Sequence, residues 1–161
     1  MDNQEIISKI KNMYIMLLYA ISKEDINRVK QYLSADLLER YANMIKENIS
    51  NNVIQKYGEL NVASVDIINK KDDMIIANIV VKYIDYKIDR TSKKYVEGEK
   101  TRSKRDVTLR VKCLEENKEL LYRCSNCGAP LNINLTSVCT YCGQSVDRND
   151  SPYVIESIEI K

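Results

Sequence analysis

Four cysteines in two matched pairs carry the clearest chemical signal in this sequence. Cys124 and Cys127 enclose two residues, Cys139 and Cys142 enclose two more, and a glycine follows each pair. This spacing lets two thiolates bind one metal ion, and glycine permits the tight turn because it adopts positive φ without steric cost. Two such turns build a closed tetrahedral site, the usual arrangement of a structural zinc ion.

The two cysteine pairs also belong to a short internal repeat. The second pair follows the first at a distance of fifteen positions, and Leu131 and Val146 stand in equivalent places, where we expect them to cover the site. Soft thiolates in a tetrahedron select zinc or iron. We therefore predict a structural Zn²⁺ ion, with redox iron, a disulfide or a transferable metal as the alternatives. The predicted metal ligands are Cys124, Cys127, Cys139 and Cys142.

The composition limits the class of protein. The 161 residues carry a formal charge of +2 and include no histidine, which excludes imidazole ligands and histidine acid–base chemistry. A nearly neutral chain disfavours a dedicated nucleic-acid binder, which usually has a clear basic excess. The apolar run at 13–21 is too short to cross a bilayer, and we recognise no secretion signal. Five cysteines then fit a reducing compartment, so we expect a cytoplasmic protein.

Apolar residues spaced three and four apart predict helices in the first third of the chain. The first helix has its apolar stripe from Ile6 to Ile21. Ser22 has the features of an N-cap for a second, short helix. Ser34 is the expected N-cap of a longer helix, and Gly58 is the expected C-terminal glycine of that helix.

The pattern then changes to the two-residue period of strands. We predict strands at 60–69, with a bulge near residues 63–64, at 75–86, with apolar residues on both faces, and at 107–113. Cys113 falls on an inward position of the third strand, where a small buried hydrophobe is a better interpretation than a ligand or nucleophile.

A further strand, 153–160, follows the cysteine pairs. It cannot belong to the small metal-binding segment alone, so we expect it to return to the main sheet. This predicts one domain formed by 1–122 plus 147–161, interrupted by an inserted zinc ribbon at 123–146. The fold class is α+β, with N-terminal helices packed on a curved, cone-like antiparallel sheet and the small ribbon before the last strand.

Together these features resemble a known family. The cysteine segments read Cys-x-x-Cys-Gly-Ala-Pro-Leu at 124–131 and Cys-x-Tyr-Cys-Gly at 139–143. These motifs, with helices ahead of a curved sheet, resemble bacterial relatives of the C-terminal domain of mitochondrial translocase subunit 44, in the nuclear-transport-factor-two-like superfamily. The resemblance spans about residues 10–161, although Tyr153 stands where relatives often have tryptophan and their upstream membrane segment is missing.

The resemblance implies a noncatalytic interaction or adaptor module. Its cone would bind a protein segment, a membrane surface or a small apolar ligand, while zinc braces an exposed ribbon. It also implies a cytoplasmic protein that can sit peripherally at the inner face of the membrane. Fold alone does not choose among these partners, and the sequence does not specify an oligomeric state.

One alternative is a zinc-ribbon protein associated with nucleic acid. The segment 87–105 carries eight basic and three acidic residues, a net charge of +5, and a basic loop could follow phosphates or anionic lipid heads. Charge runs are more often solvated hairpins that protect strand ends, and the ribbon itself offers no basic face. We therefore disfavour nucleic acid as a partner.

A second alternative is an enzyme whose reaction takes place in the cone. Asp66 and Asp85 lie in strand segments, and Tyr83 and Tyr86 could donate hydrogen bonds. Both carboxylates alternate with apolar neighbours, which favours outward-facing positions. No nucleophile–base set stands out, so we predict no catalytic residues and no cofactor other than zinc.

Overall fold

The computed structural model describes residues 3–113, 121–123, 127, 129–132, 139, 141–143 and 153–161. Helices come first and strands follow, which confirms the α+β class. The elements are α1 (Asn3–Ser22), η1 (Ile26–Tyr32), α2 (Ala35–Ser50), β1 (Val53–Lys71), β2 (Met74–Asp89), β3 (Tyr95–Gly98), β4 (Ser103–Cys113), β5 (Leu121–Arg123), β6 (Pro130–Asn132) and β7 (Tyr153–Ile160).

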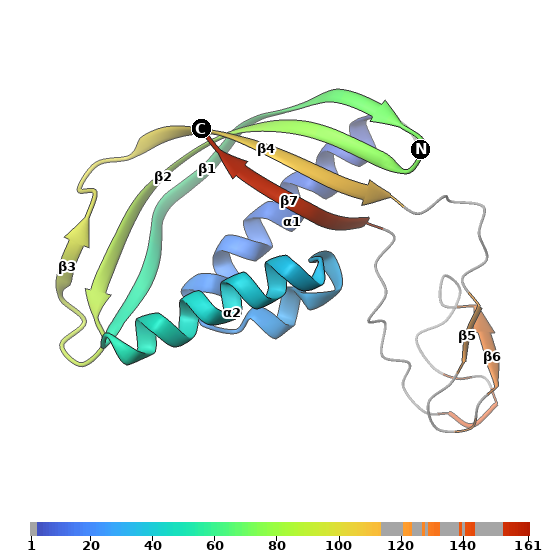
Figure 1. Cartoon of the computed structure of the whole chain (residues 1–161), viewed down its shortest axis with the longest axis horizontal. Helices are drawn as coiled ribbons and strands as arrows, with labels where there is room; N and C mark the ends of the chain where they lie inside the picture. The colour runs from blue at the N-terminus through green and yellow to red at the C-terminus, as the bar shows by residue number, and fades with distance from the viewer. Residues whose placement is uncertain are drawn as a thin grey trace.

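The main sheet is antiparallel and curves over the helices (Figure 1). Its strand order is β1-β2-β4-β7, and β3 pairs with the far end of β2. The register of β1 on β2 shifts at three places, one of them between Val62 and Ser64, where the sequence predicts a bulge. Bulges bend a strand and increase its twist, which helps two such long strands to curve around the helices.

The last strand returns to the main sheet, as predicted. Val107 pairs with Ile160 and Cys113 with Tyr153, so β7 lies along β4 from Val107 to its end. The start of α2 is hydrogen-bonded to β7, because Ser34 N donates to Ile155 O at 3.0 Å. Strands β5 and β6 form a separate two-stranded sheet, which Figure 1 places beyond the ends of β4 and β7.

The core lies between the inner face of the sheet and α1. The inward residues of β2 from Ile75 to Tyr83 are buried, and so are Val107, Leu109 and Val111 of β4 and Ile155 and Ile158 of β7. Full burial of each large aliphatic side chain contributes about 1.5–3 kcal/mol. Cys113 packs half-buried against this core, in agreement with its interpretation as a small hydrophobe.

The end of α1 differs from the prediction. Ser22 is the last residue of that helix, and Asp25 precedes η1 without a side-chain cap bond. The helix closes with hydrogen bonds from Asp25 N to Ala20 O and from Glu24 N to Ile21 O, with Glu24 at φ 57°. This is a Schellman-type C-terminus, in which glutamate occupies the position that usually carries glycine.

Helix α2 begins as predicted but ends earlier. The Ser34 side chain accepts from Leu37 N at 3.3 Å, which confirms the N-cap. The helix stops at Ser50, and Asn52 takes the left-handed conformation with φ 58°. Asparagine tolerates that conformation, so the turn occurs there and Gly58 lies within β1, opposite Ile84.

Candidate functional sites

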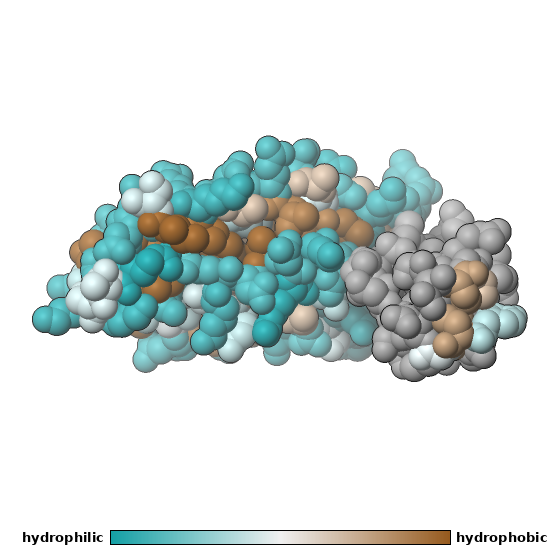
Figure 2. Space-filling model, turned by 90° about the horizontal axis from the view of Figure 1, so that it is seen from below, coloured by the Kyte–Doolittle hydropathy of each residue, from teal (hydrophilic) through white to brown (hydrophobic). Residues whose placement is uncertain are grey.

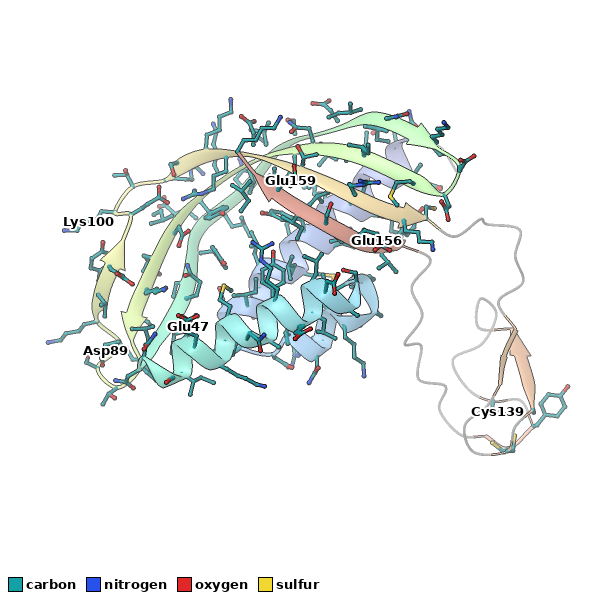
Figure 3. The ribbon with its side chains drawn as sticks, in the orientation of Figure 1. Glu47, Asp89, Lys100, Cys139, Glu156 and Glu159 are labelled. Atoms are coloured by element: carbon teal, nitrogen blue, oxygen red, sulfur yellow. The ribbon has the colours of Figure 1, made fainter. Side chains whose placement is uncertain are left out.

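Three of the four predicted cysteine ligands lie together. The sulfurs of Cys127, Cys139 and Cys142 are all within 4.8 Å of one another, and Figure 3 shows Cys139 beside the β5–β6 hairpin. The Cys127 and Cys139 sulfurs are 3.7 Å apart. Zn–S bonds of about 2.3 Å in a tetrahedron place sulfurs about 3.8 Å apart, so this pair has a spacing that suits a shared metal ion. Cys124 and Val146 lie outside the described residues.

The turn that carries the second pair has the expected backbone. Gly143 N donates to Cys139 O at 2.8 Å, and Gly143 has φ 78°. Positive φ favours glycine at this position, which explains the glycine after Cys142. The three sulfurs could hold a soft metal ion. The four-ligand zinc site stays a prediction.

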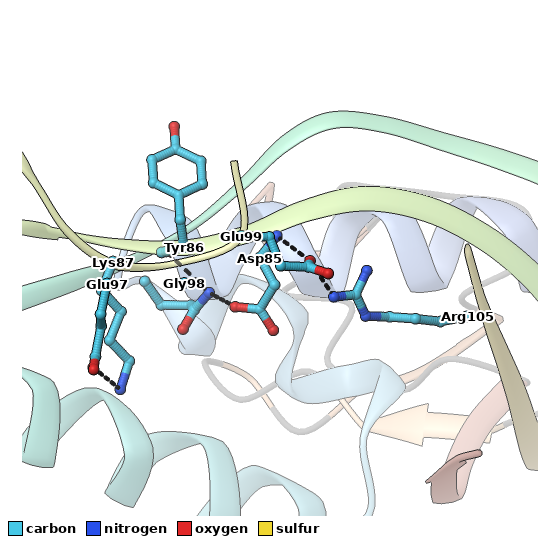
Figure 4. A pocket seen from close by; sticks show the side chains of 8 residues that line it. Asp85, Tyr86, Lys87, Glu97, Gly98, Glu99 and Arg105 are labelled. Atoms are coloured by element: carbon cyan, nitrogen blue, oxygen red, sulfur yellow. Dashed lines mark hydrogen bonds and ion pairs between the residues drawn. The ribbon is translucent and has the colours of Figure 1, made fainter. Parts of the chain in front are cut away.

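A second feature is a polar pocket of about 510 Å³ at the curled end of the concave sheet face. Strands β1, β2, β3 and β4 and the segment after β3 contribute its lining residues, most of which Figure 4 labels. Its volume is in the range of small-ligand sites. The side chains that matter below are Gln55, Asp85, Lys87, Glu97, Glu99 and Arg105.

Glu99 and Arg105 form the most highly connected ion pair of this pocket. Arg105 donates to Glu99 and lies 4.0 Å above the ring of Tyr83. Ser103 donates to the other oxygen of Glu99, and Asp85 N donates to Glu99 at 2.9 Å. The hydrogen bonds from Ser103 and Arg105 lower the pKa of Glu99 to about 2, so this carboxylate stays ionised.

Four tyrosines pack in or against the core between this face and the helices: Tyr57 and Tyr83 on the sheet, Tyr14 on α1 and Tyr41 on α2. The rings of Tyr57 and Tyr83 meet edge to face with centroids 5.2 Å apart. Burial is the main cause that raises the pKa values of Tyr14, Tyr41 and Tyr57, and it raises the pKa of Tyr83 to about 12. These phenols are therefore neutral at physiological pH and can both donate and accept hydrogen bonds.

The structure corrects the predicted direction of Asp85. Asp66 is exposed, as expected. Asp85, however, continues the alternation of the buried residues up to Tyr83 and points into the pocket, whereas Tyr86 points to the opposite face (Figure 4). Sequence reasoning also missed Gln55 and Arg105 as pocket residues. The sequence alternation already indicated the direction of Asp85, because Asp85 has an odd number like the inward-facing residues before it.

Much of the basic segment 87–105 is engaged with acids or rings. Arg90 makes a two-point ion pair with Glu24 at 2.6 Å and also donates to Val53 O at 2.8 Å. Lys87 lies 3.7 Å from Glu97. Lys100 lies over the Tyr95 ring. This pairing favours the solvated-hairpin interpretation over a surface for phosphates.

The helical side carries a smaller apolar feature. Figure 2 shows an apolar strip across the face seen from below, bordered by hydrophilic residues. Met16, Tyr19 and Val29 line a cavity of about 220 Å³ between α1 and η1. Within the described part of the chain, no helix has the length and apolar character needed to cross a membrane.

Comparisons with known proteins agree with this fold. A family model described as "Tim44-like domain" matches residues 1–108. The intermembrane space region of the chloroplast protein ARC6 has a similar crystal structure, with a TM-score of 0.56 and 9% sequence identity over 99% of this chain and 96% of that chain. At this identity the likeness concerns the fold. The search of curated proteins returns no match.

Proposed function

Because the chain belongs to the Tim44-like domain family, we propose that it is a noncatalytic interaction module whose concave sheet face binds a segment of a partner protein. The observation that carries this proposal is the open pocket at the curled end of that face. Its lining mixes carboxylates, cations and amides, which are groups that recognise polar parts of a polypeptide.

The interior supports a protein segment over an apolar ligand. Between α1 and the sheet, side chains such as Ile10 and Leu109 are fully buried and fill the cone. The remaining pocket is lined by charged and amide groups, and apolar ligands prefer predominantly hydrophobic pockets. A small apolar ligand therefore fits this pocket poorly.

We also propose that the cysteines hold one structural Zn²⁺ ion, with Cys124 as the fourth ligand beside Cys127, Cys139 and Cys142. Four protein ligands leave no coordination position for a reactive water, so the ion would brace the segment rather than catalyse. In this proposal 123–146 is an insertion into the domain of 1–122 and 147–161, and β5, which starts at Leu121, is its base.

The location is also part of the proposal. We propose a cytoplasmic protein that sits peripherally at the inner face of a membrane and meets its partners there. Lys93 and Lys94, between β2 and β3, are exposed basic residues. Contact of these residues with anionic lipid is therefore the competing interpretation.

Photo-crosslinking in the source cells tests this proposal. A photoreactive residue in place of Lys87, at the pocket rim, is expected to capture one protein reproducibly. The same residue in place of Lys70, exposed at the far end of β1, is the matched control and should capture none. Adducts at position 70 alone, adducts to lipid, or salt-sensitive nucleic-acid binding by the purified protein would each contradict the proposal.

A further inference from the structure

Asp85 is the carboxylate of the polar pocket that forms no ion pair with a described cation, although Arg105 lies near enough to interact with it electrostatically. Arg105 pairs with Glu99, and Lys87 pairs with Glu97. Among the described residues, the only hydrogen bond to the Asp85 side chain comes from the amide of Gln55, which donates to Oδ1 at 2.6 Å. The pocket lining contains three carboxylates and two cations, so its net charge is negative, and Asp85 is the carboxylate without an ion pair.

Gln55 supplies a second unsatisfied acceptor. Its Nε2 donates to Asp85 Oδ1, to Lys56 O at 3.0 Å and to Tyr86 O at 3.2 Å, and these three acceptors identify the nitrogen end of the amide. Its Oε1 receives no hydrogen bond within the part of the chain that the structure describes, and it is not among the buried unsatisfied atoms, so it remains accessible from the pocket side. This oxygen can therefore accept a hydrogen bond from a donor outside the protein.

Gln55 and Asp85 come from the neighbouring strands β1 and β2 and both line the pocket. The pocket therefore presents one carboxylate oxygen and one amide oxygen that receive no hydrogen bond from a described residue.

From this geometry we propose that the pocket binds a primary ammonium group, with Asp85 Oδ2 and Gln55 Oε1 as its acceptors. An ammonium carries three donors and no acceptor, which suits a carboxylate oxygen and an amide oxygen that receive no hydrogen bond from a described residue. An anion would face Asp85 at close range and is disfavoured. The group could belong to a free amine or to a lysine of the partner segment, and only the second source rests on the proposed function.

Titration of the full-length, metal-loaded protein by NMR tests the proposal without knowledge of the natural ligand. The probes are n-butylammonium, butyrate and N-acetyl-lysine methylamide with and without an acetyl group on Nζ. We expect saturable shifts at β2 amides with n-butylammonium and none with butyrate. If the lysine derivative binds at least tenfold tighter and its acetylated form does not bind, the source is a partner lysine; otherwise the source is a free amine.

Asp85→Asn is the decisive variant, because asparagine keeps the shape and can still accept from Gln55. It should weaken n-butylammonium binding about 10- to 100-fold, the usual worth of a charge-assisted hydrogen bond. Asp66→Asn removes an equal charge from an exposed strand position and should bind as the wild type does.

Equal affinity of Asp85→Asn and wild type, tighter binding of butyrate, or absence of n-butylammonium shifts in the wild type would overturn the inference. The butyrate and n-butylammonium titrations of the wild type need no variant, so they test the inference even if Asp85→Asn fails to fold. A protein crosslink at position 87 without amine binding would refute the ammonium site but would still support the proposed function.

Discussion

At the scale of single residues, strand register determines which charged side chains of the polar pocket lie next to each other. Glu99 lies opposite Asp85, and its oxygens receive hydrogen bonds from Ser103, Arg105 and a backbone amide. Asp85 on the same face has only an amide as its partner. Two carboxylates that line the same pocket thus have different roles, because Glu99 is paired within the fold and Asp85 is available for the proposed ligand.

Glu99 should contribute a measurable pH dependence to stability. Its pKa falls from 4.5 in an unfolded chain to about 2 in the folded protein. Its contribution is therefore fully present above pH 4.5 and is lost as the pH falls through about 2. We expect Glu99→Gln to show a smaller loss of urea stability across this window than the wild type, with denaturation midpoints measured at each pH.

Ser103→Ala is the informative companion to Glu99→Gln, since Ser103 is the largest cause of the lowered pKa. It should give an intermediate slope because the Arg105 pair remains. Identical pH slopes for the wild type and Glu99→Gln would show that this carboxylate is not stabilised in the folded state.

At the scale of elements, the β2–β3 pairing depends on one glycine. Gly98 lies opposite Tyr86 with φ +117°, and a Cβ at this position would sit 2.6 Å from the Tyr86 Cα. Backbone atoms cannot move aside as a flexible side chain can. Strand β3 carries Glu97 and leads into Glu99, so this glycine also positions one wall of the polar pocket.

Gly98→Ala should therefore lower the free energy of unfolding by about 1–3 kcal/mol or more, because the new side chain is strained in conformation and clashes with backbone. Gly58→Ala is the matched control: its φ is not positive, and the nearest atom to its Cβ would be the tip of the Tyr86 ring at 3.3 Å. We expect a change within about 1 kcal/mol there. Equal losses in urea denaturation would refute the backbone argument.

At the scale of the whole molecule, two parts are expected to have separate sources of stability. The helices and main sheet share one apolar core, whereas the β5–β6 hairpin with its cysteines is too small to bury a core of its own. Metal binding is worth about 10 kcal/mol or more in comparable zinc peptides, so metal would supply most of the stability of the cysteine segment.

Chelation should thus open the segment 121–143 to protease while the helical circular dichroism of α1 and α2 persists. Cys139→Ser should reproduce this effect and abolish bound zinc, measured by native mass spectrometry. Cys113→Ser, in the main sheet, should keep the metal content. Unchanged proteolysis after verified metal removal would argue against a metal-braced segment.

The sequence by itself determined the order of the two long helices and the four long strands, and the N-cap of α2. The apolar period of 3.6 identified α1, the two-residue alternation identified the buried face of β2, and Ser34 marked the start of α2. The matched cysteine spacing predicted that sulfurs would meet, and three of them do. These are local signals, carried by residues within one or two turns or along one strand.

Only the tertiary structure decided where the first long strand begins and which charges meet. The helix-to-strand turn falls at Asn52 rather than at Gly58 because several residues tolerate that backbone conformation. Gln55, Asp85 and Arg105 come from three strands, and their meeting depends on cross-strand register over tens of residues. A local sequence pattern does not determine that register, because the register depends on how the whole sheet packs against α1.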